Sequence, residues 1–137
     1  MSVVKSKRGK SDLEIINKAK ELAVYTIKIC GNEKNFPKRH RWSITNKIVN
    51  SAVDIHGNIR KANEIFIKMK VDYTERRRCQ NKARGEISEL LGNMDIAYDL
   101  FGVDDARIDY WTGLVINVKT LLLNWMKSDY DRYKDLK

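Results

Sequence analysis

Apolar residues recur at spacings of three and four along most of the chain, the pattern typical of helices that bury one face. The first such stretch begins at Ser11 and ends at Gly31 and Asn32, two residue types that tolerate the backbone of a helix end. Its apolar positions are Leu13, Ile15, Ile16, Ala19, Leu22, Ala23, Ile27 and Ile29. The pattern therefore predicts a first helix over residues 11–30.

Three further helical stretches follow. The second enters through Pro37, which fits a first helical turn because no backbone N–H is needed there. The third follows a polar joint near residues 68–71, or continues the second with a kink, and it runs to Gly102. The fourth begins near Asp104 and Asp105, whose charge suits a helix N-terminus. The positions expected to be buried are Ile48, Ala52, Ile55, Ile59, Ala62 and Phe66; Ala83, Ile87, Leu90, Met94, Ala97 and Phe101; and Ile108, Trp111, Val115, Val118, Leu122 and Trp125.

This organisation predicts an all-α fold, an up-and-down antiparallel four-helix bundle. The bundle is expected over residues 11–127, between a flexible basic arm at 1–10 and a polar tail at 128–137. The second and third helices would each have about 30 residues and a length of roughly 45 Å, which makes the bundle elongated. Gly57 interrupts the second stretch, either for close approach of another helix or at a local irregularity.

Length and composition describe one domain with a single core, since the chain has 137 residues. No window has the roughly 20 consecutive apolar residues of a membrane span. The basic N-terminus has no apolar run behind it and does not resemble a secretory signal, so a cytoplasmic protein is expected. Cys30 and Cys79 are not in a C-x-x-C motif and are expected to be packed thiols.

The charge is unevenly distributed. The net charge is +9, with eleven basic and four acidic residues in 1–41, seven and two in 68–84, but six and ten in 85–137. A chain that is basic in its first two thirds favours polyanionic partners. The alternative is a solvated surface whose basic charge has no ligand.

The basic residues form two clusters that we interpret as candidate phosphate contacts. The role of Trp42, next to the first cluster, stays open between base stacking and packing. The other two tryptophans, Trp111 and Trp125, are expected in the core. For the second cluster, the alternative is that its basic side chains pair with acids such as Glu86, Glu89 or Asp95. The candidates are Lys38, Arg39 and Arg41 in the first cluster and Arg76, Arg77, Arg78, Lys82 and Arg84 in the second.

The sequence favours no catalytic pattern. His40 and His56 lie in different contexts, without the spacing of a bundle metal site. Asp95 and Asp99 share a helix face, but such a pair is usually solvated. The glycines are dispersed and do not form a phosphate-binding loop. We therefore expect no enzyme, no metal and no cofactor.

The start of the second stretch reads Asn35-Phe36-Pro37-Lys38-Arg39-His40-Arg41-Trp42, followed by Ile44-Thr45-Asn46-Lys47-Ile48 and Ala52-Val53-Asp54-Ile55. The chain is similar to the accessory variability determinant (Avd) proteins of diversity-generating retroelements, and to the four-helix-bundle proteins encoded in intervening sequences of 23S ribosomal RNA genes. The likeness lies mainly between Phe36 and Asn63. Within the second group a run ending in Pro-x-Asn-Ile-Ala-Glu-Gly is usual, but this chain has His56 for the proline and Arg60-Lys61-Ala62 at the end, which favours the Avd group.

The resemblance implies a bundle that assembles into a ring-like homopentamer with a basic surface. It further implies binding to a reverse transcriptase and to RNA or DNA during mutagenic retrohoming, without a membrane partner. The alternative hypothesis is a structural or protein-interaction bundle of the intervening-sequence type, with no role for nucleic acid.

Overall fold

The computed structural model describes the backbone of residues 10–137 and the side chains of residues 14–137. The expected basic arm therefore lies, except for the backbone of Lys10, outside the described residues. Within them there are helices and no strand, so the all-α prediction is confirmed. The long helices are α1 (Lys10–Cys30), α2 (Asn46–Glu64), α3 (Lys70–Phe101) and α4 (Asp105–Tyr133).

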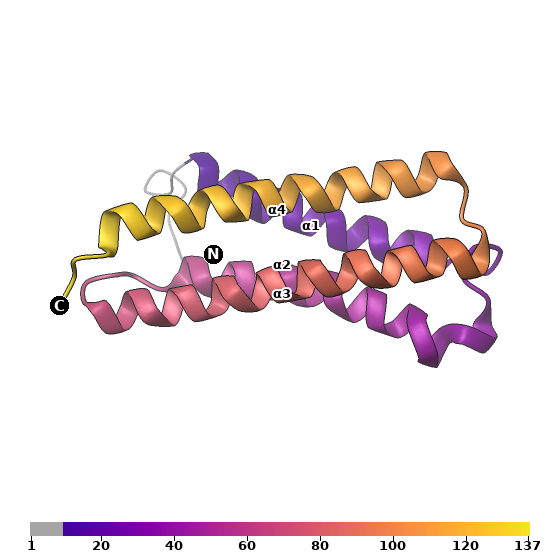
Figure 1. Cartoon of the computed structure of the whole chain (residues 1–137), viewed down its shortest axis with the longest axis horizontal. Coiled ribbons are helices and arrows are strands. Elements are labelled where there is room, and N and C mark those ends of the chain that lie inside the picture. The colour runs from indigo at the N-terminus through magenta and orange to yellow at the C-terminus, as the bar shows by residue number, and fades with distance from the viewer. Residues whose placement is uncertain (1–9) are drawn as a thin grey trace.

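The four helices run alternately up and down along one long axis (Figure 1). Each helix packs against its neighbours in sequence, and α4 closes the bundle against α1. The joint between α2 and α3 lies at the same end of the bundle as the C-terminus. The α1–α2 connection and the α3–α4 joint lie together at the opposite end, so segments far apart in the sequence share that end.

The core follows the predicted spacing closely. Trp111 is fully buried, and its Nε1 donates a hydrogen bond of 2.9 Å to Thr26 Oγ1. The Thr26 hydroxyl in turn donates to the Leu22 carbonyl oxygen at 2.7 Å, so the buried indole and hydroxyl both have partners. The buried residues that were predicted from spacing in the last three helices are Ile48, Ala52, Ile55, Ile59, Ala62, Ala83, Ile87, Leu90, Met94, Ala97, Trp111, Val115, Val118 and Leu122.

Two predicted core positions, Phe66 and Ile27, are exposed, and three others, Phe101, Ile108 and Trp125, are only partly buried. The predicted core residue Leu13 lies outside the described side chains. Phe66 is 75% exposed because α2 ends at Glu64 and the chain turns to an extended conformation at Ile65. Ile27 is about half exposed, since the buried face of α1 passes through Thr26 instead. Trp125 is half-buried, and the following Met126 takes the buried position.

The second helix is shorter than the expected 30 residues. The segment after Pro37 forms a 3₁₀ turn, η2 (Lys38–His40), and a π-helical turn, η3 (Arg41–Thr45), before α2 begins. The α2–α3 joint, predicted near residues 68–71, covers residues 65–69, and Asp72 accepts the backbone N–H groups of Lys68 and Met69 there, both at 3.0 Å. Gly102 ends α3 with a positive φ of 66°, as its position predicted.

The predicted polar tail must be corrected. Helix α4 continues to Tyr133, and Asp129 within that segment is only 2% exposed. The helix continues because the Asp129 carboxylate has an ionic partner on α3, which makes burial of a charged residue possible. Residues 128–133 therefore belong to the bundle.

Gly57 permits a prediction about stability. It lies inside α2, and an added Cβ would meet no atom within 4 Å, so neither close helix approach nor strained backbone requires glycine. We expect Gly57→Ala to raise the free energy of unfolding by about 0.5–1 kcal/mol, because alanine restricts the unfolded chain and favours the helix. Urea unfolding followed by circular dichroism measures the change. Gly102→Ala is the contrasting control and is expected to destabilise, because its φ is positive.

Candidate nucleic-acid interface

The α1–α2 connection is held at both of its ends by buried side chains. Phe36 is buried, and its ring meets Phe101 edge-on at 5.5 Å between centroids and Trp111 at 6.0 Å. Ile44 and Thr45 are buried on the other side. Aromatic contacts of this kind add to the stabilisation from burial alone. The residues between these anchors are thus fixed in place at one end of the bundle.

Besides Ser43, the side chains exposed between the anchors are basic or aromatic: Lys38, Arg39, Arg41 and Trp42. We call them the basic–aromatic surface. Trp42 is 84% exposed, the most of any large apolar residue in the described chain. A tryptophan in the open beside three cations is unusual, since indole rings are mostly buried in proteins. The position of Trp42, left open by the sequence, is therefore on the surface.

The contacts of this surface leave most of its charge available. Lys38 Nζ lies 3.3 Å from a carboxylate oxygen of Glu33, but both groups are exposed and such a pair contributes little. Within residues 14–137, Arg39 and Arg41 form no salt bridge. Arg39 Nε donates to His40 Nε2 at 3.2 Å, and the His40 ring lies 5.3 Å from Phe101. The π-helical turn that carries Arg41 and Trp42 is of a type found often at functional sites.

Arg76 does not lie on a basic surface, which corrects the prediction from sequence. Its Nη1 lies 3.1 and 3.3 Å from the two carboxylate oxygens of Asp129, and its Nη2 donates to the Ile65 carbonyl oxygen at 2.7 Å. Gln80 Nε2 donates to the same carboxylate at 2.9 Å. Arg76 therefore joins α3, α4 and the α2–α3 joint in a buried polar network.

Arg77 is also turned inwards, contrary to the prediction. Its Nη2 donates to the Met126 carbonyl oxygen at 2.6 Å and to Tyr73 Oη at 3.0 Å. A guanidinium that donates hydrogen bonds to a backbone carbonyl and a phenol of its own bundle has a structural role. The spacing of the arginines could not reveal this, because the acceptors belong to a distant part of the chain.

The rest of the second cluster is exposed but scattered. Arg78 pairs with Glu75 one helical turn earlier, and Lys82 lies one turn further along the same side. Arg84, two residues after Lys82, points to another side of the helix. These residues precede Phe101, beside the basic–aromatic surface, by 17 to 23 positions, or roughly 25–35 Å at the helical rise. The structure does not bring the two predicted clusters together.

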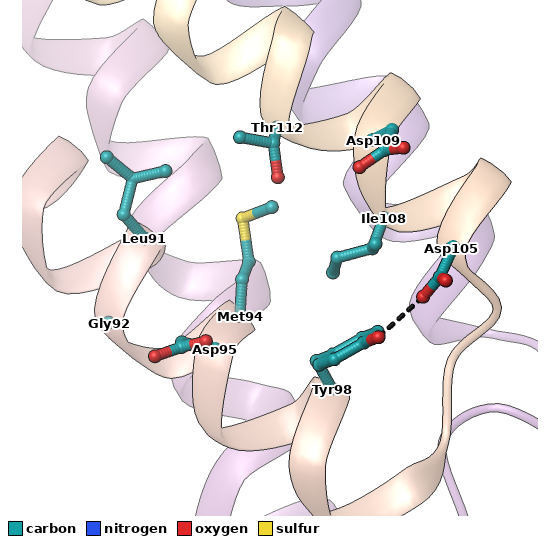
Figure 2. A pocket seen from close by; sticks show the side chains of 9 residues that line it. All are labelled: Leu91, Gly92, Met94, Asp95, Tyr98, Asp105, Ile108, Asp109 and Thr112. Atoms are coloured by element: carbon teal, nitrogen blue, oxygen red, sulfur yellow. Dashed lines mark hydrogen bonds between the residues drawn. The ribbon is translucent and has the colours of Figure 1, made fainter.

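A hollow between α3 and α4 was not foreseen. Its volume is about 680 Å³, and its lining includes Asp95, Tyr98 and Asp109 (Figure 2). From the sequence, Asp95 was expected to be a solvated charge or a partner of the second basic cluster, and Tyr98 gave no signal. The proximity of acids on both sides of the Gly102 turn was the available clue, because a tight turn brings the end of one helix against the start of the next.

The described residues offer no other obvious chemistry. No group of three or more histidines, cysteines or acids among them could hold a metal ion. Cys30 and Cys79 are buried and not bonded to each other, and burial raises the pKa of the Cys30 thiol to about 12, so it stays protonated at neutral pH. None of the helices in this part of the chain is long and apolar enough to cross a bilayer.

The comparisons with known proteins assign no family. No family model, no curated protein and no solved structure matches the chain. The candidate interface is therefore assigned from its geometry and charge alone.

Proposed function

We propose that this protein is a non-catalytic accessory factor that binds single-stranded nucleic acid at the basic–aromatic surface. The observation that carries the proposal is the exposure of Trp42 beside Arg39 and Arg41. An aromatic ring stacks on any unpaired base, and arginines contact phosphates on either side of it. This combination gives affinity that tolerates sequence and depends on salt.

The resemblance to Avd proteins suggests the setting. In it, the protein would act with a reverse transcriptase in a diversity-generating retroelement, and would hold RNA or cDNA during mutagenic retrohoming. A ring-like homopentamer would present five such surfaces, and linked sites increase apparent affinity well beyond that of one site. The residues of the basic–aromatic surface lie within the motif that carries the resemblance.

The alternative function is a purely structural or protein-interaction bundle. The hollow between α3 and α4 favours it, because apolar and acidic side chains meet there. Under this alternative the net charge of +9 would have no ligand. Nucleic-acid binding at physiological salt separates the two functions.

The test measures fluorescence anisotropy of a labelled polyuridine RNA over a series of salt concentrations. We expect binding that weakens with salt, with a log–log slope of about −0.7 for each phosphate contacted on a single strand. Trp42→Ala should weaken binding about tenfold, since stacking one base contributes about 1–3 kcal/mol. Helix content should not change, because the side chain is exposed.

The matched control is Phe66→Ala, which removes another exposed aromatic ring close to a lysine at the opposite end of the bundle. Its RNA affinity should equal that of the wild type. Equal losses in both variants would show that the ring at position 42 has no special role. No RNA binding even at low salt would favour the protein-interaction function.

A further inference from the structure

The hollow between α3 and α4 has an apolar floor and an acidic rim. Leu91 and Met94 of α3 and Ile108 of α4 form the floor. Figure 2 shows these side chains directed into the hollow, with the carboxylates around them. The rim carboxylates belong to Asp95, Asp105 and Asp109, and we call the whole feature the acid-rimmed groove.

The carboxylates of the rim are largely uncompensated. Asp95 and Asp109 are exposed and form no salt bridge within residues 14–137. Asp105 accepts a hydrogen bond of 2.5 Å from Tyr98 Oη. That bond and the charge of Asp105 raise the pKa of the Tyr98 phenol, and the nearby charges of Asp99 and Asp109 raise it further. The groove is thus a region of negative potential on a protein that is basic as a whole.

The combination of floor and rim specifies the chemistry of an occupant. A phosphate backbone would be repelled by the carboxylates, which excludes nucleic acid at neutral pH. A leucine-like side chain fits the apolar floor, and arginine or lysine on either side of it would reach the rim. Interfaces commonly combine an apolar centre with charged residues at the edge, where complementary charge sets specificity and speeds association.

The position of the groove relates it to the basic–aromatic surface. Tyr98, in the groove, precedes Phe101 by one helical turn, and the Phe101 ring lies 5.3 Å from that of His40. Opposite charges are therefore displayed at the same end of the bundle. A polypeptide in the groove and a nucleic acid on the basic–aromatic surface would be neighbours without competing for one site.

We propose that the acid-rimmed groove is the docking site for a basic segment of a protein partner, in which an apolar side chain lies between arginines or lysines. The identity of this partner rests on the proposed function, under which it is a protein that works on the same nucleic acid. The groove supplies its own chemistry: the floor takes the apolar side chain, and the three carboxylates take the cations.

The experiment uses the full chain and a short fluorescent peptide in which leucine alternates with arginine. We expect saturable binding that falls about tenfold in Asp95→Asn/Asp109→Asn, the effect of two partly exposed charge contacts. The matched control, Glu14→Gln/Glu89→Gln, makes the same change in net charge at exposed sites outside the groove and should bind as the wild type does. A peptide with serine for leucine should also bind more weakly, which tests the floor without altering the protein.

The outcomes separate this proposal from the proposed function. RNA affinity should be the same in wild type and in Asp95→Asn/Asp109→Asn, so loss of peptide binding with RNA binding retained identifies the groove itself. Equal peptide affinity in the groove and control variants would overturn the proposal. A change of oligomeric state in the groove variant during sedimentation would overturn it too, because the occupant of the groove would then be a second copy of the chain.

Discussion

We expect Asp129→Ala to lower the free energy of unfolding by about 3–5 kcal/mol, the cost of leaving one member of a buried ion pair without its partner. The Asp129 side chain is 2% exposed and that of Arg76 only 13% exposed. Removal of the carboxylate leaves the Arg76 guanidinium in the interior with the Ile65 carbonyl as its remaining hydrogen-bond acceptor. It also deprives the buried Gln80 amide of its acceptor.

Urea unfolding followed by circular dichroism measures this effect. Asp131→Ala is the matched control, because it removes an exposed carboxylate two residues further along the same helix. Its effect should stay within about 0.5 kcal/mol, as for most surface substitutions. Similar losses of unfolding free energy in the two variants would mean that the buried position of Asp129 adds nothing to the stability of the protein.

A double variant distinguishes a coupled pair from two independent residues. Arg76→Met/Asp129→Leu replaces both charges with apolar side chains, and we expect it to be more stable than Asp129→Ala, because no charge remains buried alone. The coupling energy between the two positions comes from the corresponding double-mutant cycle.

Reversal of charge on the basic–aromatic surface is expected to have the largest effect on binding. Arg39→Glu/Arg41→Glu should weaken binding of single-stranded RNA about a hundredfold at low salt, because each hydrogen bond to a charged group contributes about 1.5–3 kcal/mol. The free energy of unfolding should change little, since both side chains are exposed and neither is paired with an acid within residues 14–137. Anisotropy and urea unfolding of the same samples measure both quantities.

Lys82→Glu/Arg84→Glu makes the same change in charge on α3 and decides between the two predicted clusters. We expect a smaller loss of RNA affinity than for the surface variant, because these residues lie far along α3 and on different sides of it. A greater loss in the α3 variant would transfer the binding surface to that helix. The arginines at 76 and 77 are unsuitable for this comparison, since their substitution would disturb the bundle.

The helical pattern predicted the fold well because burial of one face is a local, periodic property. The core positions of α3 from Ala83 to Ala97 and the turn at Gly102 are where the spacing placed them. A local pattern of residue types does not predict which groups from distant parts of the chain a side chain contacts. Arg76 was indistinguishable from Arg78 in the sequence, yet one meets a buried carboxylate 53 residues away and the other an exposed acid on its own helix.

The candidate sites likewise differ in how far the sequence predicts them. The cluster around Trp42 was predictable, because its residues are adjacent in the chain and lie between apolar anchors. Its π-helical turn was not, since the residue types at 41–45 also suit an ordinary helix. The acid-rimmed groove depends on how closely α3 and α4 approach each other beyond the turn that joins them. The spacing of apolar residues along the chain does not predict that distance.

The three tryptophans occupy three different environments, which gives the protein intrinsic fluorescent reporters. Trp111 lies in the core, Trp125 is half-buried with the Arg76 guanidinium 5.7 Å from its ring centroid, and Trp42 is in solvent. Emission from these rings differs in wavelength and in access to a collisional quencher. Variants that retain one tryptophan each would follow the core, the buried ion pair and the basic–aromatic surface separately, without an attached dye.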